Sequence, residues 1–215
     1  MNKITIETVK EVIQGSRNFF RNLKKEKSVG KGVSYFVVLS FLAIGISLFA
    51  YTERLNDNIA RLYSLTGLNL LDFGLDVTWD TYVLLLVSFV LLATLFTFVR
   101  YYIVHFFVSY FVASKYKDTY NSLSFSVTPG YIGLVLFGIA FLLWPIEIFI
   151  VQVLAWLFFI SSIFFEGYSF YIRSKGLAVT HGISVFSAFL CIYVFTGLVL
   201  LLIGGIMLGA VLLIA

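Results

Sequence analysis

Five long apolar segments divide this chain and constrain its fold more than any other feature. A helix that spans a bilayer needs about 20 mostly apolar residues. The segments run over Val33–Tyr51, Thr81–Ala113, Tyr131–Trp144, Ile146–Phe165 and Ile183–Ile214. Because 60% of the residues are hydrophobic and only 12% are charged, a soluble domain could not bury so much apolar surface. The sequence therefore predicts an all-α polytopic membrane bundle of five transmembrane helices. It excludes a soluble enzyme, a nucleic-acid-binding module and a disordered chain.

Two of the segments have lengths that do not match one bilayer crossing. Thr81–Ala113 is longer than a hydrocarbon core about 30 Å thick requires. Its helix therefore either tilts and projects beyond the membrane or bends near Arg100. Tyr131–Trp144 is short, and it either recruits Ser124–Pro129 or continues past Pro145. The sequence leaves the boundaries of these two spans open.

Basic residues are distributed unevenly between alternate connections. Thirteen of the 15 lie before the first segment, or in and beside the connections after the second and fourth segments. The loop at 52–80 carries only two, together with five acidic residues. Since basic residues accumulate on the cytoplasmic side of membrane proteins, we expect the N-terminus inside and the C-terminus outside. The predicted domains are a basic cytoplasmic segment at 1–32 and a membrane domain at 33–215.

The N-terminal segment combines an apolar stripe with a cluster of positive charge. The apolar residues that recur with helical spacing are Ile6, Val9, Ile13, Phe20 and Leu23. Basic residues lie among and after them: Arg17, Arg21, Lys24, Lys25 and Lys27. We predict an amphipathic interfacial helix that rests on the cytoplasmic face and favours anionic lipids. The alternative is a solvated basic flank that only sets the topology.

Polar residues recur on one face of the second segment. They are Thr94, Thr97, Tyr101, His105 and Ser109, with Arg100 one position off the face. Together with Gln152 in the fourth segment they form a candidate polar seam. The seam could line a cavity or a proton path, as in a small transporter or channel. It could equally be a helix–helix interface in which hydroxyl and imidazole groups bond across helices.

Charged and small residues elsewhere indicate contacts with partners or within the bundle. Glu166, Arg173 and Lys175 fall near the connection after the fourth segment. They predict either a salt-bridged loop or a surface for a cytoplasmic partner. Gly205 and Gly209 give a GxxxG spacing that allows close helix packing, inside the bundle or in a homodimer.

Motifs for catalysis or cofactor binding are absent from the sequence. It contains no GxSxG nucleophile motif, no HExxH zinc motif and no phosphate-binding loop. Cys191 is the single cysteine, and the two histidines, His105 and His181, are far apart in the sequence. We therefore predict that the protein is not an enzyme and holds no metal or cofactor.

Four stretches of the chain resemble a known family of membrane proteins. Arg17–Tyr35 has paired aromatic, basic and small residues before the first span, and His105-Phe106-Phe107 closes the second span. Tyr116–Gly133, with the sequence YKDTYNSLSFSVTPGYIG, leads through tyrosines and serines to Pro-Gly, and Phe164–Phe186 links the last two spans. In these features the sequence resembles the Yip-domain family (Ypt-interacting-protein type), in a prokaryotic form.

The resemblance implies both a fold and a role. It implies five spans with the N-terminus inside and, in eukaryotic members, membrane traffic through Rab-type GTPases and membrane shaping. This chain would then be a non-enzymatic membrane scaffold in a prokaryotic cytoplasmic membrane, with a small GTPase as partner only by analogy. It departs from the family at Ser114-Lys115-Tyr116, where members often carry Gly-Gly, and in its short N-terminal region.

Overall fold

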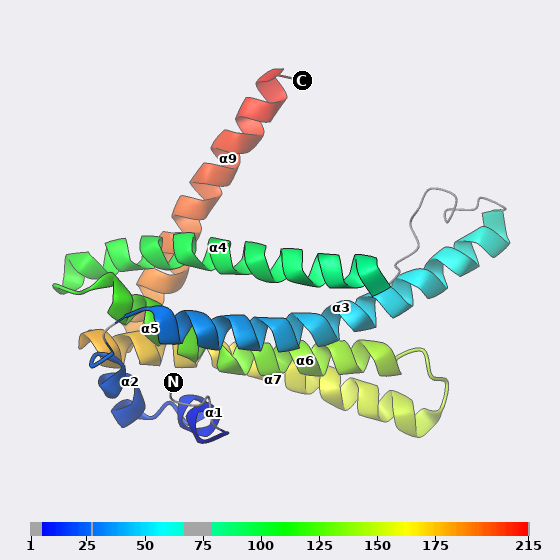
Figure 1. Ribbon diagram of the computed structural model, residues 1–215, viewed down its shortest axis with the longest axis horizontal. Helices are drawn as coiled ribbons and strands as arrows, with labels where there is room; N and C mark the ends of the chain where they lie inside the picture. The colour runs from blue at the N-terminus through cyan, green and yellow to red at the C-terminus, as the bar shows by residue number, and fades with distance from the viewer. Residues whose placement is uncertain (1–5, 27, 67–78, 215) are drawn as a thin grey trace. The chain divides into compact units, whose positions relative to one another are not determined.

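The fold is built from helices joined by short connections. The computed structural model describes residues 6–26, 28–66 and 79–214, and within those ranges the chain contains no strand. The elements (Figure 1) are α1 (Ile6–Ile13), α2 (Arg17–Leu23), α3 (Gly30–Thr66), α4 (Trp79–Phe111), α5 (Tyr116–Ser126), α6 (Thr128–Leu143), α7 (Phe149–His181), α8 (Val185–Phe189), the π-helix η2 (Leu190–Phe195) and α9 (Thr196–Ile214). The loop expected at 52–80 is helical as far as Thr66, and residues 67–78 lie outside the described ranges.

Five helical stretches are long and apolar enough to cross a membrane, which confirms the predicted five-span bundle. They are Gly30–Thr52, Trp79–Phe111, Tyr116–Leu143, Phe149–His181 and Val185–Gly205. The second stretch continues as one α-helix through Arg100. The third begins well before Tyr131, because α5 and α6 follow each other with only Val127 between them. The protein is therefore an integral, multi-pass membrane protein.

The chain divides into two compact units, and α3, α4 and α7 each contribute residues to both of them. Unit 1 contains residues 1–35, 95–127 and 169–215, and unit 2 contains residues 36–94 and 128–168. The basic side chains that the structure describes all belong to unit 1: Lys10, Arg17, Arg21, Lys24, Lys25, Lys31, Arg100, Lys115, Lys117, Arg173 and Lys175. The described basic residues that we predict to be cytoplasmic therefore fall in a single unit. The orientation itself stays a prediction.

Unit 2 is held together by close contacts of α3 with α4 and α6. The hydroxyl groups of Ser40 and Tyr131 lie 2.5 Å apart, and the Tyr82 hydroxyl donates to the carbonyl of Gly45 at 2.7 Å. A Cβ built on Gly138 would lie 3.2 Å from the Cα of Ser47, so the backbones of α3 and α6 approach closely. Small residues permit such approach between membrane helices.

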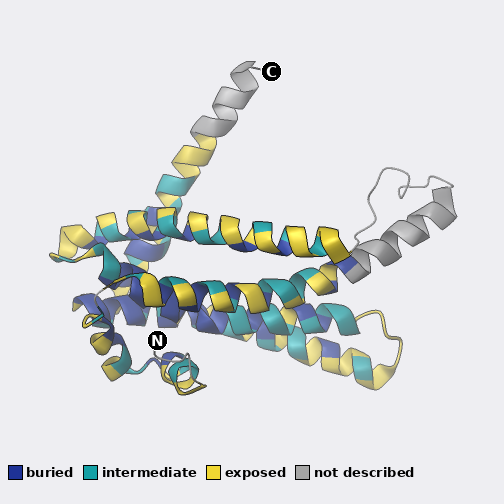
Figure 2. Ribbon diagram, viewed as in Figure 1, coloured by how far each residue is buried: buried dark blue, intermediate teal, exposed yellow. Residues whose placement is uncertain are grey.

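Unit 1 is built around α5, which is an unusual core element because it is polar. Every residue from Asp118 to Ser126 is buried, and in Figure 2 this helix is almost entirely in the buried colour. Apolar residues pack around it from α4, α7, α8 and η2: Tyr101, Val104, Val108, Leu177, Ala178, Ala188, Cys191 and Ile192. The core of unit 1 thus encloses a helix that has few apolar residues of its own.

The N-terminal segment forms two helices where the sequence predicted one. Gly15 has a φ of 61°, which ends α1, and the Ser16 hydroxyl accepts from the Phe19 amide to cap α2. Both helices contact α5. Phe20 is fully buried and Leu23 nearly so. Part of the apolar stripe that we expected to enter lipid therefore packs against the protein.

Candidate functional site

The polar residues of α5 define the candidate site, since buried polar groups must find hydrogen bonds or lose the free energy of their hydration. The buried polar side chains are Asp118, Thr119, Asn121, Ser122, Ser124 and Ser126. All lie in unit 1. Thr119 and Asn121 bond to the end of α4, the end of α7 and the N-terminal linker, and Ser126 donates to the Ser122 carbonyl within α5. The buried hydroxyls of Ser122 and Ser124 have no partner among the described residues.

Two histidines converge on one hydroxyl of α5. His105 Nδ1, on α4, lies 3.1 Å from Thr119 Oγ1, which lies 3.0 Å from His181 Nε2, on α7. A hydroxyl has one hydrogen, so Thr119 donates to one imidazole and accepts from the other. With both imidazoles neutral, the two rings hold the same tautomer, Nε2–H if Thr119 donates to His105 and Nδ1–H if it donates to His181. The single hydroxyl thus joins three helices. Sequence separation gave no indication that these histidines would meet.

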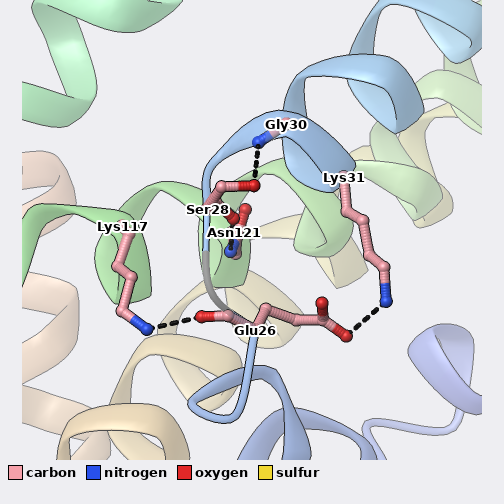
Figure 3. A network of polar contacts seen from close by, with 6 residues as sticks. All are labelled: Glu26, Ser28, Gly30, Lys31, Lys117 and Asn121. Carbon is pink, nitrogen blue, oxygen red and sulfur yellow. Dashed lines mark hydrogen bonds and ion pairs between the residues drawn. The ribbon is translucent and has the colours of Figure 1, made fainter.

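Two side chains of α5 form hydrogen bonds with the linker between α2 and α3 (Figure 3). Lys117 donates from Nζ to the backbone carbonyl of Glu26, and Asn121 donates from Nδ2 to the carbonyl of Ser28 at 3.0 Å. The carboxylate of Glu26 also pairs with Lys31 at 2.6 Å. The entry into the first span is thus fixed by side chains of α5.

Gly32, in the first turns of α3, faces the same part of α5. A Cβ at this position would lie 2.5 Å from the Asn121 side-chain oxygen and 3.2 Å from the Asn121 Cα. A glycine here lets the backbone of α3 approach α5 closely. Asn121 and Lys117 are not among the site residues predicted from the sequence. The available signal was the density of hydroxyl and amide residues between two apolar segments.

The predicted polar seam is only partly brought together. Thr97, Tyr101 and His105 face the interior or its edge in unit 1, and the Tyr101 ring stacks edge-on against Tyr120 at 5.4 Å. Ser109 is exposed and its hydroxyl donates to the Phe106 carbonyl of its own helix. Two members belong to unit 2: Thr94, which bonds to the Val90 carbonyl, and Gln152, which is exposed.

The predicted lipid or partner surface also divides. Four of its residues are exposed on α2 and the turn after it: Arg17, Arg21, Lys24 and Lys25. Lys27 lies outside the described residues. Arg173 and Lys175 lie in unit 1 on α7, which continues to His181 where we expected a loop. Glu166 is exposed in unit 2, and no ion pair joins it to these two residues in the described part of the chain.

The sequence matches the model of a known protein family over most of its length. Residues 10–208 match the Yip1 domain, a range that includes all five spans, all of unit 2 and most of unit 1. The chain belongs to the Yip1 domain family. Searches of curated proteins and of solved structures find no match. In this Yip1 domain, the N-terminal helices are an integral part of unit 1. A prokaryotic origin stays a prediction.

Proposed function

We propose that this Yip1 domain protein is a non-enzymatic membrane scaffold whose N-terminal helices attach to an anionic membrane surface. One observation carries the proposal. The apolar residues Phe20 and Leu23 of α2 are buried in unit 1, while Arg17 and Arg21 on the same helix are exposed. The helix therefore holds its charges in a fixed orientation relative to unit 1.

Electrostatics favours a lipid surface as the target of this face. Lys24 and Lys25 continue the exposed basic surface beyond α2. Each basic residue near an anionic leaflet contributes about 1 kcal/mol of attraction. A membrane domain whose basic face is rigidly attached can gather anionic lipids around itself, and this is how it would influence membrane composition and shape. Both N-terminal helices already pack onto α5, so we do not propose that they bind a small GTPase.

We expect neutralisation of this basic face to abolish its attachment to anionic lipid. The full chain, labelled at an Asn18→Cys position, is reconstituted into vesicles whose head groups carry a quencher. Phosphatidylserine-rich vesicles should quench the label much more than phosphatidylcholine vesicles, and high salt should remove the difference. The variant Arg17→Gln/Arg21→Gln/Lys24→Gln/Lys25→Gln should lose up to about 4 kcal/mol of attraction, at about 1 kcal/mol per charge.

A charge-conserving variant separates charge from packing. Arg17→Lys/Arg21→Lys/Lys24→Arg/Lys25→Arg should retain the salt-sensitive quenching. The proposal is wrong if the wild-type label is quenched equally in neutral and anionic vesicles, or if the glutamine variant keeps its dependence on salt.

A further inference from the structure

Two arginines of unit 1 lie in membrane-spanning helices without an acidic partner. Arg100 is on α4 and Arg173 is on α7, and both are half-buried. Their helices both pack on η2, where the Phe107 ring of α4 lies 5.1 Å from the Phe195 ring and the Phe170 ring of α7 lies 4.8 Å from the Tyr193 ring. The two like charges repel each other. Neither guanidinium forms an ion pair with a described residue, and Arg173 Nε is buried without a hydrogen-bond partner. Such an arrangement of like charges is unfavourable unless an anion completes it.

Further polar groups lie beside the two guanidinium groups. Ser169 precedes Arg173 by one turn, so both lie on the same face of α7. Ser169 is 1% exposed, and its hydroxyl has no hydrogen-bond partner. Tyr193 belongs to η2, and its hydroxyl is buried. The Tyr193 ring packs 4.8 Å from Phe170, which joins η2 to α7.

The local backbone supports a role beyond packing. Tyr193 lies in a π-helix, and the Thr196 hydroxyl donates to the Cys191 carbonyl in the same segment at 2.7 Å. Short π-helical segments are rare in proteins, and those that do occur often lie at functional sites. Here the π-helix places the Tyr193 phenol on the side of η2 that meets α7.

We propose that Arg100 and Arg173, assisted by Ser169 and Tyr193, bind a phosphate group. The guanidinium group is planar and offers paired donors that match phosphate oxygens, and hydroxyl groups complete the coordination. Basic pockets between transmembrane helices bind phosphorylated lipid head groups in this way. The residues are separate from the exposed basic face of α2, so this site does not depend on the proposed function.

Thermal unfolding of the full chain in nanodiscs tests the site. Three ligands distinguish the source of the phosphate: phosphatidic acid, phosphatidylglycerol and soluble inorganic phosphate, each compared with phosphatidylcholine alone. We expect phosphatidic acid to raise the unfolding temperature of the wild type. A response to inorganic phosphate as well would identify a free anion as a sufficient ligand, whereas a response to lipid only would identify a head group.

Substitutions separate ligand binding from folding, because the two arginine charges repel each other when no anion is bound. Arg100→Gln and Arg173→Gln should each weaken phosphatidic acid binding by at least about tenfold. Without the ligand, both variants should unfold at the wild-type temperature or above it. Arg173→Lys keeps the charge and should weaken binding less. The matched control Lys115→Gln removes an exposed charge that belongs to neither proposed site, and it should leave the ligand-induced shift unchanged.

The outcomes that overturn the proposal are specific. It fails if no phosphate-bearing ligand stabilises the wild type, or if both glutamine variants keep the full ligand-induced shift. A glutamine variant that unfolds at a lower temperature without ligand would show that the arginines already have a structural partner, and it would also overturn the proposal. If a glutamine variant cannot be purified, Ser169→Ala provides a milder test and should weaken binding measured by native mass spectrometry.

Discussion

Replacing Gly176 with leucine is expected to release the N-terminal helices from unit 1. A Cβ at Gly176 would collide with the Ser126 hydroxyl, and it would lie 2.7 Å from a ring atom of Phe20. Phe20 is fully buried and belongs to α2, which is short. Overpacking of a core costs about 1–3 kcal/mol, and occasionally more. We expect a loss near the upper end, because the leucine side chain has no space to occupy unless α2 moves.

Limited proteolysis and thermal unfolding of the full chain would measure this effect. In the wild type, the segment at 6–26 should resist cleavage, and in Gly176→Leu it should be cut rapidly while the membrane helices stay intact. Gly197→Leu is the matched control, since nothing lies within 4 Å of a Cβ at that position. Equal protection of the N-terminal helices in both variants would show that α2 does not depend on the space at Gly176.

The same variant connects packing to the proposed function. Only the burial of α2 holds Arg17 and Arg21 in a fixed orientation. If α2 is released, the charges remain but become part of a flexible tail. We therefore expect Gly176→Leu to keep some salt-dependent quenching of the Asn18→Cys label, but less than the wild type. A scaffold needs the fixed orientation, whereas a topology signal does not.

The span count could be predicted from the sequence because it depends on one local property, the length of apolar runs. The lengths of Val33–Tyr51 and Ile146–Phe165 are sufficient for this purpose without any knowledge of their neighbours. The start of the third span could not be predicted in the same way. Tyr116–Ser126 is polar, so it has the composition of an exposed connection, and it is buried only because residues distant in sequence surround it.

The site was predictable to the extent that its residues share a helix face. Tyr101 and His105 were selected by their spacing on the second segment, and both reach the core of unit 1 or its edge. Thr119 and His181 were missed as partners of His105, since their contact joins positions 62 residues apart. The extension of α7 through Arg173 was also missed, because a basic stretch with glycine resembles a loop.

Removing the hydroxyl of Thr119 is expected to be the most destabilising single conservative change in unit 1. Thr119→Val preserves the shape of the side chain but removes both bonds, at 3.1 Å to His105 and at 3.0 Å to His181. His105 Nδ1 keeps the Ser114 hydroxyl at 3.4 Å, whereas the buried His181 loses its partner. A buried polar group left without a partner costs about 1–3 kcal/mol, so we expect a loss in that range. The loss should appear as a lower thermal unfolding temperature.

Three further variants make this result specific to the hydrogen bonds. Thr119→Ser keeps the hydroxyl and should retain most of the stability. Thr94→Val removes a hydroxyl that donates to the Val90 carbonyl of its own helix, so it should change stability by no more than about 0.5 kcal/mol. His181→Phe in the Thr119→Val background replaces both partners by apolar groups, and it should recover part of the loss. If Thr119→Val unfolds at the wild-type temperature, the hydrogen bonds of this hydroxyl to the two imidazoles do not stabilise unit 1.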